Sequence, residues 1–262
     1  MTMEMALRLG AFFGIFSAMA LWEARAPMRG LVAPWLRRWG TNWGMSILDA
    51  LTVKLIFGAA AAGAALDAGA GGWGLFNRLD WPAWAEIVLS LLVLDLAIWL
   101  QHLLTHKIPL LWRLHRVHHT DRDVDVTTAI RFHPVEIAFS MCVKIGLVYA
   151  LGIPVAAVIA FEVLLNGMAM FNHSNVRLPA GADRWLRRIV VTPDMHRVHH
   201  SVDRAEHDAN YGFNLSVWDR LFGTYVAQPA GGHVEMTIGL QPWQDDRPTR
   251  LGWSLALPFF RK

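Results

Sequence analysis

Cysteine and charge are both scarce in this chain. It contains one cysteine, Cys142, among 262 residues, and only 17% of the residues are Asp, Glu, Lys or Arg. A single cysteine cannot form a disulfide within the chain, and it cannot supply a thiolate cluster for zinc or iron–sulfur. No DNA- or RNA-binding motif is visible either, so we predict no nucleic-acid partner. A metal site in this chain must therefore take its ligands from histidine.

Hydrophobic residues are abundant instead. They make up 54% of the chain, including 13 Trp, which is too apolar for an ordinary soluble domain. Three apolar runs are each near the length of about 20 residues that spans a bilayer, and a fourth, longer run is interrupted at residues 152–154. These runs are Met5 to Trp22, Ser46 to Leu66, Trp84 to Leu104 and Ile137 to Phe171. We predict an all-α membrane protein with about three transmembrane helices plus a helical hairpin.

The distribution of positive charge predicts the orientation of these helices. Arginines follow the first run at Arg25, Arg29, Arg37 and Arg38, whereas the segment between the second and third runs has only Arg78. The positive-inside rule then places residues 23–43 in the cytoplasm. Two further crossings return the chain to the cytoplasm at about residue 106, where the next basic residues begin. The first run also resembles a signal peptide, but its early acidic residue and late basic residue favour a membrane anchor.

Histidine is concentrated in one part of the chain. The pentapeptide His-Arg-Val-His-His occurs at residues 115–119 and again at residues 196–200, and ten of the twelve histidines lie between His102 and His200. Residues at i, i+3 and i+4 share one helix face, so each pentapeptide can bring its three imidazoles together. His102 and His106 form a further i, i+4 pair. Eight imidazoles exceed what one ion can bind, which predicts two metals in a helical domain that caps the membrane helices on the cytoplasmic side.

Residues outside these motifs are weaker candidates for this site. His173 and His133 flank the predicted hairpin, and each is either a ligand or a group that supports a ligand. Asp95 lies on the same helix stripe as His102, so we predict that its carboxylate accepts the distal N–H of a ligating histidine. His207 and His233 fall outside the clusters, and we expect them at the surface, although His207 could line the site.

The metal and its chemistry are not fixed by these histidines. Zinc with water and iron with O₂ are both compatible with several imidazoles and open coordination positions. The His-Glu-x-x-His pattern of zinc hydrolases is absent, and so many histidines at a membrane surface favour two irons that activate O₂ against a C–H bond of a lipid. A membrane zinc hydrolase and a non-catalytic metal-binding protein remain the alternatives. Residues 69–74 match a dinucleotide-binding fingerprint only in glycine spacing, so we predict no bound nucleotide cofactor.

The histidine motifs together with their flanking sequences resemble a known family. The pattern His102-x-x-x-His106, His115-x-x-His118-His119 and His196-x-x-His199-His200 is similar to that of the fatty acid hydroxylase superfamily, in its sterol desaturase branch. The likeness runs from about residue 95 to residue 237 and includes Thr128-Ala-Ile-Arg-Phe-His-Pro134, Phe171-Asn-His-Ser-Asn175 and Trp218-Asp-Arg-Leu-Phe-Gly223. It implies a domain over residues 95–237, preceded by transmembrane helices in residues 1–94 and followed by a tail of residues 238–262.

The resemblance also implies an activity. Members of the superfamily are integral membrane oxidoreductases with two non-haem irons, which use O₂ to hydroxylate or desaturate sterols and fatty acyl or alkyl lipids. By similarity, the eight motif histidines bind iron, and His173 matches a frequent additional ligand. Electrons would come from an external ferredoxin- or cytochrome b5-like protein with its reductase. Zinc could replace iron in a purified sample, because divalent metals exchange according to availability.

Overall fold

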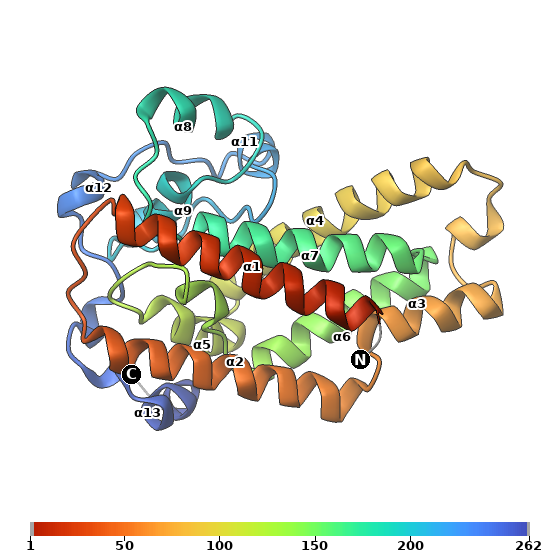
Figure 1. Ribbon diagram of the computed structural model, residues 1–262, viewed down its shortest axis with the longest axis horizontal. Coiled ribbons are helices and arrows are strands. Elements are labelled where there is room, and N and C mark those ends of the chain that lie inside the picture. The colour runs from red at the N-terminus through yellow and green to blue at the C-terminus, as the bar shows by residue number, and fades with distance from the viewer. Residues whose placement is uncertain (1–2, 261–262) are drawn as a thin grey trace.

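The computed structural model describes residues 3–260, and its regular structure is helical (Figure 1). The described residues form no named strand; three isolated β-bridges pair short segments, for example Pro27 with Val176. The α-helices that reach membrane length or continue such a helix are α1 (Met3–Arg25), α2 (Trp35–Phe57), α3 (Ala60–Gly71), α4 (Ala83–Lys107), α6 (Pro134–Leu151) and α7 (Val155–Asn172). The shorter helices are α5 (Pro109–His119), α8 (Ala180–Leu186), α9 (Pro193–His199), α10 (Arg204–His207), α11 (Val217–Leu221), α12 (Gly232–Glu235) and α13 (Leu251–Ala256).

Five segments are long and apolar enough to cross a membrane, in agreement with the predicted fold class. They are α1, the α2–α3 segment, α4, α6 and α7. The predicted hairpin is confirmed: Gly152 ends α6 in the left-handed conformation, with φ of 71°, and Pro154 precedes α7. The second apolar run differs from the prediction of one helix, because Gly58 has φ of 59° and ends α2 before α3 begins.

The long helices bring their polar ends to one end of the molecule. Figure 1 shows the C-terminal ends of α1, α4 and α7 and the N-terminal end of α2 beside the short helices α5 and α9, away from the α6–α7 turn. Apolar residues of α3, α4, α6 and α7 form the largest core, which includes Leu94, Val148 and Phe161. The bundle therefore holds α5 and α9, which carry the two histidine pentapeptides, against the ends of α4 and α7.

Candidate metal centre

Nine buried histidines form two groups at this end of the bundle. In each group the nitrogen atoms that could bind an ion all lie within 4.8 Å of one another. Each side chain is at most 7% exposed. The first group consists of His102, His106, His115, His119 and His199, and the second consists of His118, His173, His196 and His200. The structure thus brings the eight motif histidines and His173 together.

Each pentapeptide is divided between the two groups. His115 and His119 of α5 belong to the first group, whereas His118 belongs to the second. The second pentapeptide has the opposite arrangement, because His199 joins the first group while the other two join the second. At 3.6 residues per turn, positions i+3 and i+4 point about 100° apart on either side of position i. The imidazoles of one pentapeptide therefore share a face without converging on a single ion.

Acceptors around the site orient many of the imidazoles. The Nδ1 atoms of His102, His199 and His173 lie 2.7–2.8 Å from the carbonyl oxygens of Tyr211, Ala209 and Ala169, respectively. A carbonyl oxygen can only accept, so each of these Nδ1 atoms carries the proton and donates it. The tautomer that results leaves Nε2 without a proton and turned into the group, as a metal ligand requires.

Within the groups, unprotonated nitrogens face one another. The Nε2 atoms of His102 and His115 lie 3.1 Å apart, and those of His118 and His173 lie 3.2 Å apart. The outer Nδ1 atoms of all four rings have acceptors, so the paired Nε2 atoms present lone pairs to each other. The buried Nε2 atoms of His106, His119, His199 and His200 have no hydrogen-bond partner. A cation in each group would resolve both features, so the residues present fit a metal ion in each.

Burial also keeps these imidazoles neutral. The pKa of His118, His119, His196, His199 and His200 lies well below the usual value, because burial disfavours the charged ring and neighbouring imidazoles repel a second charge. Burial lowers the pKa of His173 to about 4. Neutral imidazole is the form that binds a metal, so the groups are ready to bind at neutral pH.

Glu136, rather than Asp95, is hydrogen-bonded to a clustered histidine, and Oδ1 of Asp208 lies 3.4 Å from Nδ1 of another, His106. Oε1 of Glu136, in the first turn of α6, lies 2.6 Å from Nδ1 of His115. Asp95 instead accepts hydrogen bonds from the indole N–H of Trp218 at 2.8 Å and from the backbone N–H of Leu215. Asp95 therefore fixes the segment before and within α11, and the structure does not place it on a histidine.

The remaining histidines lie outside both groups. The Nδ1 atom of His133 accepts from the backbone N–H of Val135 at the start of α6, and its Nε2 atom lies 3.2 Å from the Leu255 oxygen, so His133 caps a helix. His207 and His233 are buried, contrary to the expected surface positions. The His207 ring stacks on Trp112. Its centroid lies 6.1 Å from the ring centroids of His106 and His119, so His207 lies beside the first group.

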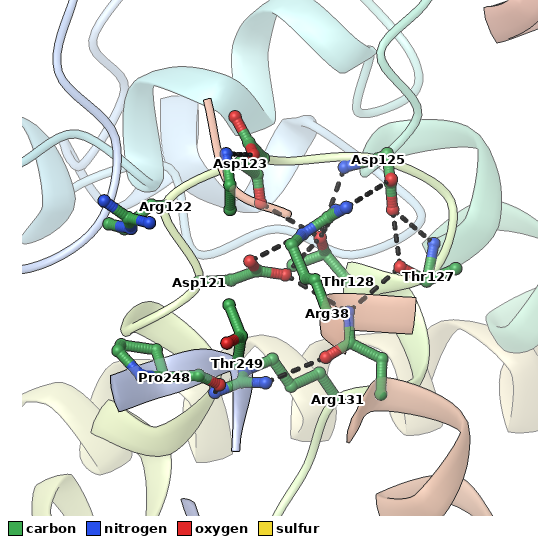
Figure 2. Close-up of polar contacts among 12 residues, drawn as sticks. Arg38, Asp121, Arg122, Asp123, Asp125, Thr127, Thr128, Arg131, Pro248 and Thr249 are labelled. Carbon is green, nitrogen blue, oxygen red and sulfur yellow. Dashed lines mark hydrogen bonds and ion pairs between the residues drawn. The ribbon is translucent and has the colours of Figure 1, made fainter. Parts of the chain in front are cut away.

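A buried ionic network holds the loop after α5 in place (Figure 2). Arg38, on α2, contacts Asp121 at 2.7 Å and Asp125 at 2.6 Å, and all three side chains are at most 3% exposed. The amide of Asn42, one turn further along α2, donates to Asp121. Figure 2 also shows Arg131 reaching from the other end of this loop toward Pro248 and Thr249. The loop is thereby tied to α2 and to the C-terminal segment.

This network reaches the second histidine group through Arg131. Its guanidinium donates to the oxygens of Val117 and Pro248 and to the Asn42 side chain. Its own carbonyl oxygen lies 3.2 Å from Nδ1 of His118. Arg131 therefore fixes the acceptor that orients His118. Its place in the sequence, among Thr128-Ala-Ile-Arg-Phe-His-Pro134, gave no sign of this role.

Comparison with known proteins places this site in a family. A family model described as fatty acid hydroxylase matches residues 87–224, which is more than half of the chain and contains all nine histidines of the two groups. The chain belongs to the fatty acid hydroxylase family. Arg38, Asn42 and the rest of α1 and α2 lie outside the matched region, so part of the support for the site comes from helices that precede the fatty acid hydroxylase domain.

The relatives of this fatty acid hydroxylase family member act on different lipids, as their names state. The chain is 32% identical over 159 residues to the ornithine lipid hydroxylase OlsE of Rhizobium tropici, covering 61% of this chain and 47% of that protein. It is 31% identical over 149 residues to the alkylglycerol monooxygenase of Xenopus tropicalis, covering 56% of this chain and 31% of that protein. It is 26% identical over 146 residues to human cholesterol 25-hydroxylase, covering 53% and 50%. The matches thus span half or less of each relative, and no solved structure matches the chain.

Proposed function

We propose that this protein is a membrane oxygenase that uses two irons and O₂ to hydroxylate or desaturate a lipid. Hydroxylation would follow R–H + O₂ + 2e⁻ + 2H⁺ → R–OH + H₂O, in which one oxygen atom enters a C–H bond and the other is reduced to water. The protons come from solvent, and the two electrons come from an external redox protein of the ferredoxin or cytochrome b5 kind, supplied by its reductase.

The pair of buried histidine groups carries this proposal. Two groups with five and four imidazoles provide neutral nitrogen ligands for two ions, without a cysteine or carboxylate among them. Imidazole suits iron as well as zinc, and open positions on such ions allow a substrate or O₂ to bind. The hydroxylase and monooxygenase relatives support iron with O₂ over zinc with water. When bound, iron would supply the oxidising power that no side chain has.

The protein's own residues have three tasks in this scheme. His102, His106, His115, His119 and His199 would hold one ion, and His118, His173, His196 and His200 the other. The carbonyl and carboxylate acceptors keep the rings in the ligating tautomer. Phe132 and Phe213 each pack on rings from both groups. The ring centroids of Phe132 and His118 are 4.6 Å apart, and those of Phe213 and His102 are 5.3 Å apart. They provide an apolar, water-excluding surface at the junction of the groups.

The membrane helices suggest how the lipid is presented. α4 and α7 both end in the site, so a lipid chain lying beside them could bring one carbon to the histidine groups from the bilayer. We place this end of the molecule on the cytoplasmic side. The arginine-rich segment between α1 and α2 lies at this end, and segments rich in arginine stay in the cytoplasm. A cytoplasmic position also gives soluble electron donors access to the site.

Metal analysis and O₂ uptake of the detergent-purified protein test the proposal. The assay contains membrane lipid extract and a chemical reductant, and a variant with both His118→Ala and His199→Ala serves as the control. We expect about two irons per chain and lipid-dependent O₂ consumption in the wild type only. Turnover without O₂ in a zinc-loaded protein would favour a hydrolase. Bound metal without any turnover after iron reconstitution would favour a non-catalytic protein.

A further inference from the structure

Large apolar side chains are exposed outside the five membrane-length segments. On and just after α8, Trp185 is 61% exposed and Ile189 is 52% exposed. On and just after α11, Leu221 is 66% exposed and Phe222 is 50% exposed. Clustered exposed apolar residues on a folded protein mark a surface that meets another apolar phase.

These two helices belong to one unit, which we call the α8–α11 platform (residues 180–191 and 214–222). The backbone N–H of Ser216 donates to the Ile189 oxygen, and its hydroxyl donates to the Arg187 oxygen at 2.8 Å. Val190 and Leu215 also form a β-bridge. The exposed side chains of both helices are thus carried by one connected element.

The platform packs beside α4 within its membrane-spanning length. The indole N–H of Trp99 donates to Asp219 at 3.0 Å, and the Trp99 ring stacks on Phe222 at 4.5 Å. Asp95, one turn further from the histidine site, binds the indole N–H of Trp218. In the view of Figure 1, α8 lies further from the membrane-length helices than α11 does.

These contacts show at which level of α4 the platform is attached. At 1.5 Å per residue, Trp99 and Asp95 lie about 5 Å and about 10 Å along α4 from His102, toward the membrane interior. Elements that rest in a bilayer interface bury their apolar face by about 5–10 Å, at the boundary of headgroups and acyl chains. α11 is therefore attached to α4 one to two turns from His102, within the segment that is long and apolar enough to cross the membrane, although neither it nor α8 is long enough to cross.

The charges on the platform match this position. Arg184 and Arg188 flank Trp185, and both are exposed. Arg220, which precedes Leu221, is also exposed, and its guanidinium donates to the Arg187 oxygen and lies over the Tyr225 ring. An aromatic and aliphatic surface edged by arginine suits acyl chains and the phosphate groups beside them. A soluble acidic partner could use the arginines, but it would leave without an apolar partner the exposed side chains of Leu221 and of Phe222, which stacks on Trp99 of α4.

We propose that the α8–α11 platform is a monotopic membrane-binding surface whose occupant is the bilayer itself, with Leu221, Phe222 and Trp185 among the acyl chains and the arginines at anionic headgroups. This inference does not depend on the chemistry proposed for the metal centre. It does connect the bilayer to that centre, because the chain between the platform's two parts carries Tyr211, whose oxygen orients His102.

Spin-label accessibility measures directly whether the α8–α11 platform lies in lipid or in water. In a Cys142→Ser background, a nitroxide is attached at Leu221→Cys or Trp185→Cys, and the protein is reconstituted in phosphatidylcholine nanodiscs that contain phosphatidylglycerol. Two positions of similar exposure give the references: Val88, at 46%, on α4, and Val234, at 47%, on α12, which Figure 1 places at the end away from the α6–α7 turn. Relaxation by O₂, which partitions into lipid, is compared with relaxation by a water-soluble nickel complex.

We expect the labels at Leu221 and Trp185 to behave like the label at Val88, with a ratio of O₂ to nickel relaxation several times that at Val234. A ratio equal to that at Val234 would overturn the inference and leave the platform in water. Protection from both reagents would also overturn it, because a protein would then cover the surface. Thermal unfolding of each labelled variant establishes that it is folded, and the result is independent of whether the enzyme turns over.

Discussion

Nδ1 of His115 lies 2.6 Å from Oε1 of Glu136, a buried carboxylate in the first turn of α6. The contact fixes the ring so that its Nε2 atom faces that of His102. A charged acceptor also makes the imidazole a stronger ligand. Glu136 is thus a positioning residue that acts through His115.

Replacing Glu136 should weaken metal binding without unfolding the protein. Glu136→Gln keeps the shape of the side chain but removes its charge, and loss of such an outer partner typically lowers metal affinity about 10–100-fold. The measurement is a chelator competition titration followed by metal analysis. Glu235→Gln, at an exposed position on α12, is the matched control. Equal metal affinity in the two variants would refute the role of Glu136.

Asp95→Asn, in contrast to Glu136→Gln, should leave metal binding unchanged. Asp95 accepts hydrogen bonds from Trp218 and Leu215 and contacts no clustered histidine, so metal content should equal that of the wild type. The fold should lose about 1 kcal/mol, because the amide oxygen that replaces Oδ2 accepts from the same two donors without the charge of the carboxylate. Chemical unfolding gives the stability and metal analysis gives the content. Loss of metal from a folded Asp95→Asn variant would show that Asp95 acts on the ligands after all.

Neighbouring histidines should affect different ions. His118→Ala removes a ligand from the four-histidine group, and His119→Ala removes one from the five-histidine group. Each variant should therefore release one ion at a lower chelator concentration while the second ion stays bound. A combined His115→Ala and His119→Ala variant should still lose only one ion. Simultaneous release of both ions from every variant would mean that the two groups do not bind independently.

The ionic network behind the site predicts a contrast between two adjacent arginines. Arg38 is 1% exposed and pairs with Asp121 and Asp125, whereas Arg37 is exposed. Arg38→Ala leaves two buried carboxylates without their partner, which should cost about 3–5 kcal/mol. Arg37→Ala should change stability by less than about 0.5 kcal/mol. Denaturant unfolding of the two variants in the same detergent measures the difference, and equal stabilities would contradict the network.

Acid should remove the metals and weaken the fold. The pKa of His173 is lowered to about 4 and those of the neighbouring buried histidines are also lowered, whereas an unfolded chain titrates near 6.5. Below pH about 6.5 the unfolded state therefore binds more protons than the folded state, and stability falls as the pH drops toward about 4. Unfolding of the metal-free protein between pH 7.5 and pH 4.5 tests this direction, and constant stability over that range would contradict it.

Local spacing explains which features the sequence could predict. The repeated pentapeptide and the His102–His106 pair lie on helices, so their shared faces follow from helix geometry, and the turn at Gly152 and Pro154 follows from their backbone preferences. The division of each pentapeptide between two groups depends on how α5 and α9 face each other. That relationship is a tertiary contact between residues about 80 positions apart, and no local pattern contains it.

The supporting residues were harder to predict for the same reason. Arg38 meets Asp121 and Asp125 across more than 80 residues, and in the sequence Arg38 has the same character as the exposed Arg37. Asp95 shares a helix stripe with His102, which favoured a direct contact, but Leu215, before α11, and Trp218, within α11, donate to its carboxylate instead. Glu136 reaches His115 only because the loop after α5 turns the start of α6 back onto α5.

Isotope labelling of the product tests the central claim most directly. The iron-loaded protein is incubated with membrane lipid extract, a reductant and isotopically labelled O₂ in ordinary water, and the lipids are analysed by mass spectrometry. We expect a lipid that has gained one labelled oxygen atom, or has lost two hydrogens in a desaturation, and neither product with the His118→Ala, His199→Ala variant. A lipid that is cleaved with oxygen from water, at the same rate without O₂, would contradict it.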